Sequence, residues 1–150
     1  MDVTVSSLLP VIQASTTPVI LISGMGLLLL TMTNRMGRII DRTRGYAKEV
    51  REAASPKEKQ KLEIQLELTW RRAKVVRLAL TFATTSMLLA AALIVVIFVG
   101  TIAHADVGAP MLVLFAAAIL SVVAALFMFL RDIFMSLAAL QLEVQQSRDV

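Results

Sequence analysis

The residues that could do chemistry are concentrated between Thr31 and Arg44, where the sequence reads TMTNRMGRIIDRTR. On a helix, one face of this stretch carries polar residues three or four positions apart: Thr31, Asn34, Arg38 and Asp41. An adjacent stripe is basic: Arg35, Arg38 and Arg42. At the cytoplasmic headgroup level each arginine adds roughly 1 kcal/mol of attraction to anionic lipid. The stretch therefore predicts either a lipid-headgroup site or the polar mouth of an oligomeric pore. The alternative interpretation is a basic collar that ends a membrane span and continues as a solvated helix face.

Other chemistry is poorly supported by the sequence. His104 and Asp106 are the only residues that resemble an acid–base pair, and no nucleophile or third metal ligand lies near them in the sequence. We interpret them as a polar turn. The chain has no cysteine, so thiolate catalysis and zinc–thiolate sites are excluded. Ser23-Gly24-Met25-Gly26 lies within an apolar run and is not a phosphate-binding loop. We therefore expect no catalytic residue, no cofactor, no metal and no enzymatic activity.

The elements that position the basic stretch are long runs without any Asp, Glu, Lys or Arg. Val3–Thr33, Leu78–Ala103 and Val107–Leu130 are charge-free over 31, 26 and 24 residues. About 20 apolar residues are enough to cross a hydrocarbon core ~30 Å thick as a helix. The predicted fold class is therefore all-α, an integral membrane protein with three transmembrane helices.

Capping signals predict where these helices begin. Thr16 and Thr17 precede Pro18, an arrangement typical of a helix N-terminus with proline at its first position. We predict that this first helix leaves the membrane and ends near Ala53. Ser55, Pro56 and Glu58 form a capping box that predicts the start of a second helix, which runs to about Ile102. Pro110 is predicted to open a third helix that ends near Gln146.

Thirteen of the fifteen Lys and Arg residues lie between Arg35 and Arg77, which predicts the orientation. Lysines and arginines near span ends stay on the cytoplasmic side. Five basic residues beside spans two and three are expected to contact anionic lipid: Arg71, Arg72, Lys74, Arg77 and Arg131. We predict three spans in a bacterial inner membrane, with the N-terminus outside and the C-terminus in the cytoplasm. Nucleic acid is not an expected partner, because Tyr46 and Trp70 are the only aromatic residues in the basic block and single strands need stacking surfaces.

The charged block also has heptad periodicity. Apolar and small residues alternate three and four positions apart on the first helix: Met36, Ile40, Thr43, Ala47, Val50 and Ala54. The second helix repeats the rhythm: Leu62, Leu66, Thr69, Ala73, Val76 and Leu80. The third does so after its span: Leu130, Ile133, Leu137, Leu140 and Val144. This spacing predicts that the three helices extend into a cytoplasmic antiparallel coiled coil or three-helix bundle.

Within the membrane the sequence offers small and polar residues, which let helices approach closely. Span one has Ser23, Gly24 and Gly26, and span three has Ala117, Ser121 and Ala125. These residues serve packing within one chain or an interface between copies, and the sequence leaves both open. In an oligomeric pore lined by span one, Ser23, Thr31 and Asn34 would face the lumen.

The pattern from Ser23 to Arg44, SGxGxLLLxxxNRxGRxxDRxR, resembles the bacterial membrane proteins grouped as domain of unknown function family 2721. The resemblance covers most of the chain. It implies a small three-span protein of the inner membrane and transfers no catalytic residue.

The predicted organisation is a single domain over residues 1–150. Its segments are an outer N-terminal segment (1–15), span one (16–34), a cytoplasmic helical hairpin (35–77), span two (78–103), an outer loop (104–109), span three (110–130) and a cytoplasmic C-terminal helix (131–150). The first functional hypothesis is a homo-oligomeric structural or interaction protein, with a protein partner able to dock on the cytoplasmic helices. The second is an oligomeric ion channel with an arginine-rich cytoplasmic mouth. A holin-like lesion former is disfavoured by the ordered hairpin.

Overall fold

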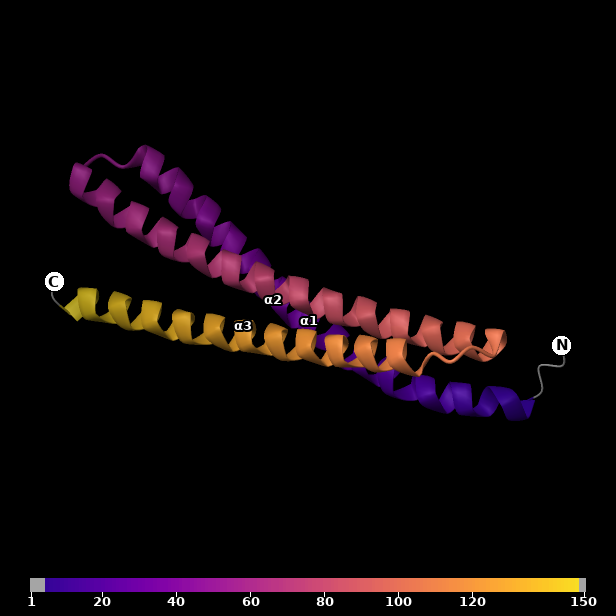
Figure 1. Ribbon diagram of the computed structural model, residues 1–150. Coiled ribbons are helices and arrows are strands. Elements are labelled where there is room, and N and C mark those ends of the chain that lie inside the picture. Colours follow the sequence, from indigo (N-terminus) through magenta and orange to yellow (C-terminus); the bar gives the residue numbers. More distant parts are fainter. Residues whose placement is uncertain (1–4, 149–150) are drawn as a thin grey trace. The chain divides into compact units, whose positions relative to one another are not determined.

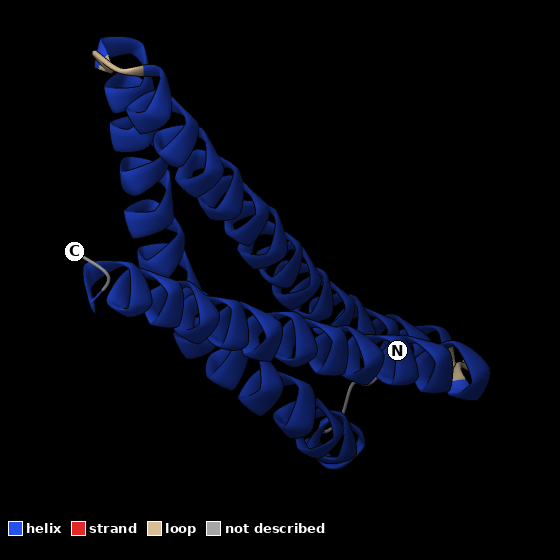
Figure 2. Cartoon of the chain, turned by 90° about the vertical axis from the view of Figure 1, so that its left-hand side faces the viewer, coloured by secondary structure: helices blue, strands red, loops and turns tan. Residues whose placement is uncertain are grey.

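The computed structural model describes the backbone of residues 5–148 and the side chains of residues 9–137. Within these residues the chain forms three helices and no strand: α1 (Val5–Glu52), α2 (Pro56–Ala103) and α3 (Gly108–Arg148) (Figure 1). Only short loops connect the helices (Figure 2). Each helix contains a segment long and apolar enough to cross a membrane. The predicted all-α fold and the three candidate spans are confirmed.

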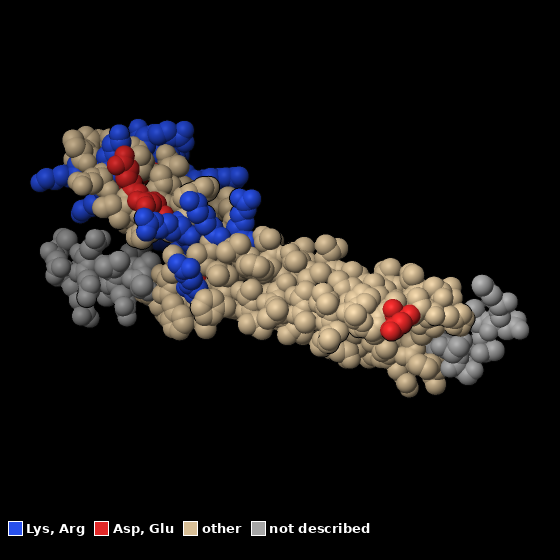
Figure 3. Space-filling view, in the orientation of Figure 1, with Lys and Arg blue, Asp and Glu red and all other residues tan. Residues whose placement is uncertain are grey.

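The three helices contribute to two compact units. The apolar unit consists of α1 up to Leu30 together with Thr81–Ala124. The charged unit consists of Thr31–Leu80 together with the chain from Ala125 onward. All fifteen lysines and arginines of the sequence lie within the two residue ranges of the charged unit. Figure 3 shows the described basic side chains gathered over that unit.

The predicted start of α1 is wrong. The helix begins at Val5, and Pro10 and Pro18 lie inside it. Ser15 and Thr16 donate their hydroxyl hydrogen bonds one turn back, to the carbonyls of Val11 (2.8 Å) and Ile12 (3.1 Å), instead of capping a new helix. Proline is tolerated inside membrane helices because neighbouring groups satisfy the carbonyl that it leaves without a donor. A proline after two threonines therefore did not mark a helix N-terminus here.

The turn between α1 and α2 follows its local sequence signals. α1 ends at Glu52 and α2 begins at Pro56, as the capping box predicted. The carbonyl of Ser55 accepts the first helical hydrogen bond, from the amide of Lys59 at 3.0 Å. This is the position of an N-cap residue.

The turn between α2 and α3 is tight and has a defined geometry. His104 adopts the left-handed conformation with φ 49°. The amide of Ala105 donates to the carbonyl of Gly100 (3.1 Å), and the amide of His104 donates to that of Thr101 (3.4 Å). These two bonds make a Schellman motif, which satisfies carbonyls at a helix C-terminus. A Cβ on Gly100 would lie 2.5 Å from a methyl carbon of Val107, so glycine is required for this close approach.

α3 begins at Gly108, two residues before the predicted start at Pro110. Asp106 explains the difference, because its Oδ1 accepts a hydrogen bond from the amide of Gly108 at 3.1 Å. Pro110 then lies in the first turn, where an amide hydrogen is not needed. The polar turn predicted for His104 and Asp106 is thus a C-cap followed by the start of α3.

Each unit has its own core. In the apolar unit Val11, Leu93 and Ile97 are buried, with Met111 and Leu114 packed against them, so all three helices contribute. In the charged unit the buried cluster joins α1 to α2, and Met36 and Leu80 pack on it. The fully or nearly buried members of this cluster are Ile39, Ala73 and Val76.

The heptad positions predicted on α1 and α2 are buried or half-buried, apart from Ala54 in the turn. The line predicted on α3 is wrong, since Leu130 is 47% and Leu137 55% exposed. The packed face of α3 contains Ala125 and Asp132, both 0% exposed. Leu140 and Val144 lie outside the residues whose side chains the structure describes.

Candidate functional site: a buried carboxylate between two arginines

Asp132 is the centre of the most unusual polar arrangement in the described chain. Its side chain is 0% exposed, although it lies on a helix whose apolar residues are largely exposed. Arg35 of α1 places its Nε 2.5 Å from Oδ2 of Asp132. Arg72 of α2 places its Nε 3.5 Å from Oδ1. One carboxylate of α3 therefore joins all three helices of the charged unit, and we call Arg35, Arg72 and Asp132 the triad.

Two further α3 residues support the arginines. Ser136, one turn after Asp132, accepts a hydrogen bond from Nη2 of Arg72 at 2.6 Å. The guanidinium carbon of Arg35 lies 5.8 Å from the centre of the Phe129 ring, one turn before Asp132. A cation over an aromatic face is attracted by the ring quadrupole. One face of α3, made of Phe129, Asp132 and Ser136, thus contacts both arginines.

The triad is not internally satisfied. The Nε atoms of both arginines and both oxygens of Asp132 are buried, yet none makes a hydrogen bond of ordinary geometry. The pairing is therefore a short-range charge interaction with poor alignment, even at the 2.5 Å distance. Two arginines against one carboxylate also leave a formal charge of +1. Burying such a charge is costly unless it is neutralised.

The triad is partly exposed, but only through its arginine side chains. The side chains of Arg35 and Arg72 keep 25% and 19% of their surface exposed, whereas Asp132 keeps none. What remains exposed at the triad therefore belongs to the arginine side chains and not to the carboxylate. By contrast, the ion pairs Arg71–Glu67 (2.6 Å) and Lys48–Glu52 (3.9 Å) are more than 60% exposed on each side. Exposed pairs contribute little to stability.

The predicted polar face of α1 is separated from the triad. Most of its members are exposed: Ser23, Thr31, Asn34, Arg38, Asp41 and Arg42. Arg42 donates from Nε to the hydroxyl of Tyr46 (3.1 Å) and lies over its ring at 5.7 Å. Arg35 points instead to Asp132, so the basic stripe predicted from Arg35 to Arg42 is divided between an inner and an outer face.

The basic residues predicted to meet lipid divide in the same way. Four of them are exposed: Arg71, Lys74, Arg77 and Arg131. Lys74 lies 5.7 Å from the Trp70 ring, and Arg71 pairs with Glu67. Arg72 alone belongs to the triad. Lipid contact stays a prediction for all five.

Asp132 is the residue that sequence reasoning missed. It is the only acidic residue between Asp106 and Glu143, and it lies two positions beyond a charge-free run. Acidic residues at membrane level are rare and usually pair with a basic partner. The sequence carries that signal but does not indicate which basic residues Asp132 contacts.

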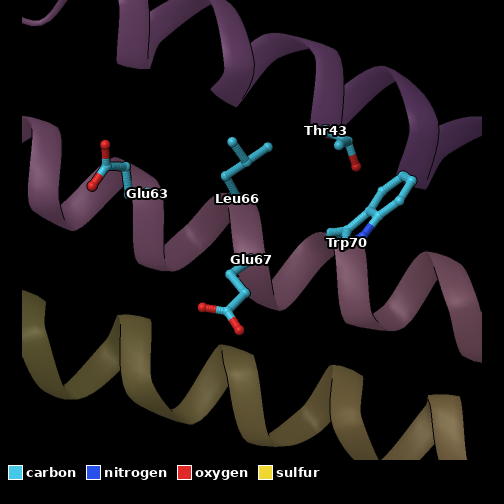
Figure 4. A pocket seen from close by; sticks show the side chains of 5 residues that line it. All are labelled: Thr43, Glu63, Leu66, Glu67 and Trp70. Atoms are coloured by element: carbon cyan, nitrogen blue, oxygen red, sulfur yellow. The ribbon is translucent and has the colours of Figure 1, made fainter.

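An apolar groove lies elsewhere in the charged unit, between α1 and α2 (Figure 4). Its volume is ≈ 380 Å³, and five residues line it: Thr43, Glu63, Leu66, Glu67 and Trp70. Two of the polar groups at the groove are already used, since Thr43 donates to the carbonyl of Ile39 (2.7 Å) and Glu67 pairs with Arg71. Among the described residues no group of three His, Cys, Asp or Glu could hold a metal ion.

Comparison with known proteins yields one match. The model of a family described as "Protein of unknown function (DUF2721)" matches residues 15–142. No curated protein and no solved structure matches the chain. The matched range covers most of the first candidate span, the other two spans, the exposed polar face of α1 and the whole triad. With most of its length in this match, and with the three apolar helices that the resemblance implied, the chain belongs to the protein family of unknown function DUF2721.

Proposed function

We propose that this protein is a non-enzymatic integral protein of the bacterial inner membrane that assembles from several copies through α1. The observation that carries the proposal is the exposed polar line on α1: Ser23, Thr31, Asn34, Arg38 and Asp41. Its first members lie within or beside the charge-free run that ends at Thr33. Polar groups that face lipid are unfavourable, so contact with a second copy or with water stabilises them.

Two features of α1 support close packing against another copy. A Cβ added at Gly24, Gly26 or Gly37 would meet nothing within 4 Å, so the backbone is open there. Small residues allow membrane helices to approach until backbone atoms touch. Leu27 and Leu30 beside them are 72% and 61% exposed, which supplies an apolar rim.

The proposed orientation places the N-terminus outside and the C-terminus in the cytoplasm. It rests on the restriction of lysine and arginine to the range of the charged unit. The half-buried heptad positions of α1 and α2 support a cytoplasmic coiled coil that serves assembly or docking of a protein partner.

Copy number in native-lipid particles tests the proposal. We expect the wild-type protein to show a mass of at least two chains by light scattering, and Asn34→Leu to shift it toward one chain. Thr85→Val, which removes an exposed polar side chain from α2, is the matched control and should leave the mass unchanged. A wild-type monomer would overturn self-assembly.

The same exposed line supports a second candidate, an ion channel in which Ser23, Thr31 and Asn34 face a pore and Arg38 lies at its cytoplasmic mouth. A cationic ring at a pore favours anions. Reconstituted protein should then carry an anion-selective current, and Arg38→Glu should reverse the selectivity. Absence of current, or a current that Arg38→Glu leaves unchanged, would exclude this pore.

A further inference from the structure

We propose that the triad binds a phosphate group, supplied by the headgroup of an anionic phospholipid, on the exposed side of Arg35 and Arg72. The inference depends on insertion of the chain into a membrane and is independent of self-assembly. In the proposed site Asp132 neutralises one of the two positive charges, and the ligand contacts the arginines and not Asp132.

Charge is the first step of the argument. The triad contains two guanidinium groups and one carboxylate, and the carboxylate is fully buried against them. The side chains that carry the remaining charge of +1 are 25% and 19% exposed, and the Nε atom of each is buried. A partly desolvated positive charge attracts an anion more strongly than a solvated one. An anion therefore complements the two arginines.

Donor geometry is the second step. Arg35 and Arg72 both direct their Nε toward Asp132, and Arg72 also donates from Nη2 to Ser136. Each guanidinium carries five N–H donors. The remaining donors of two neighbouring guanidinium groups can bind the oxygens of one phosphate in the forked arrangement that arginine favours.

Depth is the third step. Arg35 and Asp132 lie two residues beyond charge-free runs that end at Thr33 and Leu130, and Arg72 lies six residues before the run that starts at Leu78. At 1.5 Å per residue these offsets are about 3 Å and about 9 Å along the helices. The headgroup layer is roughly 5–8 Å thick on each side of the hydrocarbon core. The long side chains of Arg35 and Arg72 are therefore within reach of lipid phosphates.

The test uses the full-length protein in phosphatidylcholine nanodiscs, titrated with phosphatidylglycerol in one arm and with inorganic phosphate in the other. Bound ligand is counted by native mass spectrometry. Arg72→Gln and Arg35→Gln each leave one arginine opposite Asp132 and remove the excess charge. Because a charge-assisted phosphate contact accounts for about a tenfold change in affinity, each variant should weaken phosphatidylglycerol binding about tenfold.

Two controls separate a phosphate site from general basic attraction and from a structural clamp. Arg44→Gln removes the same charge from an exposed position of α1 for which no lipid contact is predicted, and it should leave the affinity unchanged. Asp132→Asn raises the excess charge to +2, so it should bind phosphatidylglycerol at least as well as the wild type. Circular dichroism verifies the helix content of each variant. Because Arg35 and Arg72 lie on different helices, their two variants test the dependence of phosphate binding on the arginines independently.

The outcomes are distinct. Binding of phosphatidylglycerol that depends on Arg35 and Arg72 but not on Arg44 supports a lipid-phosphate site. The same dependence for inorganic phosphate alone supports the phosphate site and overturns the lipid source. An equal loss from Arg44→Gln, or a loss from Asp132→Asn as large as that from Arg72→Gln, would overturn the proposal. Each of these measurements is independent of copy number.

Discussion

At the scale of single residues, Asp132 combines complete burial with two cationic neighbours that each retain some contact with water. Removing one partner of a buried ion pair costs about 3–5 kcal/mol when the remaining charge is fully enclosed. Because Arg35 and Arg72 are 25% and 19% exposed, water can solvate part of the charge that is left. The carboxylate therefore contributes to stability mainly by preventing repulsion between two arginines.

The corresponding prediction concerns Asp132→Asn, which keeps the side-chain size and removes the charge. We expect it to lower the free energy of unfolding by about 2–3 kcal/mol, somewhat below the range for a fully enclosed pair. Reversible unfolding in mixed micelles measures the change. Glu67→Gln is the control, because it removes a carboxylate 2.6 Å from Arg71 at an exposed site. Its effect should stay below about 1 kcal/mol, and an equal effect of both variants would contradict the importance of burial.

At the scale of elements, the turn between α2 and α3 depends on a glycine for steric reasons. A Cβ on Gly100 would meet both methyl groups of Val107, at 2.5 and 2.8 Å. Val107 is β-branched, so its methyl groups cannot move without a shift of the turn backbone. The Schellman bonds at Gly100 and Thr101 constrain that backbone.

We predict that Gly100→Ala lowers the unfolding free energy by about 1–3 kcal/mol, the usual cost of overpacking. Val107→Ala removes the clashing methyl groups. The double variant Gly100→Ala/Val107→Ala should therefore be nearly as stable as the Val107→Ala single variant. Gly45→Ala is the control, because nothing lies within 4 Å of its added Cβ. It should be neutral or stabilising by up to ~1 kcal/mol. Thermal unfolding followed by circular dichroism compares the four variants, and a Gly100→Ala protein as stable as the wild type would refute the steric argument.

The sequence predicted elements where local signals were sufficient. Ser55-Pro56 and the apolar runs correctly predicted the start of α2 and the three long helices. Pro18 was misleading, since a proline at a helix start and a proline inside a membrane helix look alike in sequence. The heptad line through Leu130 and Leu137 was misleading for another reason. Heptad periodicity considers only apolar residues, whereas α3 packs through the charged Asp132. The burial of Asp132 depends on Arg35 and Arg72, which lie 97 and 60 positions earlier in the chain.

At the scale of the whole molecule, the charge distribution predicts the orientation in the membrane. The absence of cysteine makes this prediction testable by labelling single introduced cysteines without background. In intact spheroplasts a membrane-impermeant maleimide should label Ala105→Cys in the α2–α3 turn. Ser55→Cys in the α1–α2 turn should react only after permeabilisation. The reverse pattern would overturn the orientation with the N-terminus outside.

The triad also has a consequence for how the chain is made. Arg35 and Arg72 leave the ribosome before Asp132, so the carboxylate arrives last, when both of its partners are already synthesised. A third helix inserted in the wrong direction would place Asp132 across the bilayer from Arg35 and Arg72, and both arginines would lose their counter-charge. Such a chain would be less stable and easier for proteases to degrade. The carboxylate on α3 thereby couples completion of the third span to the stability of the first two.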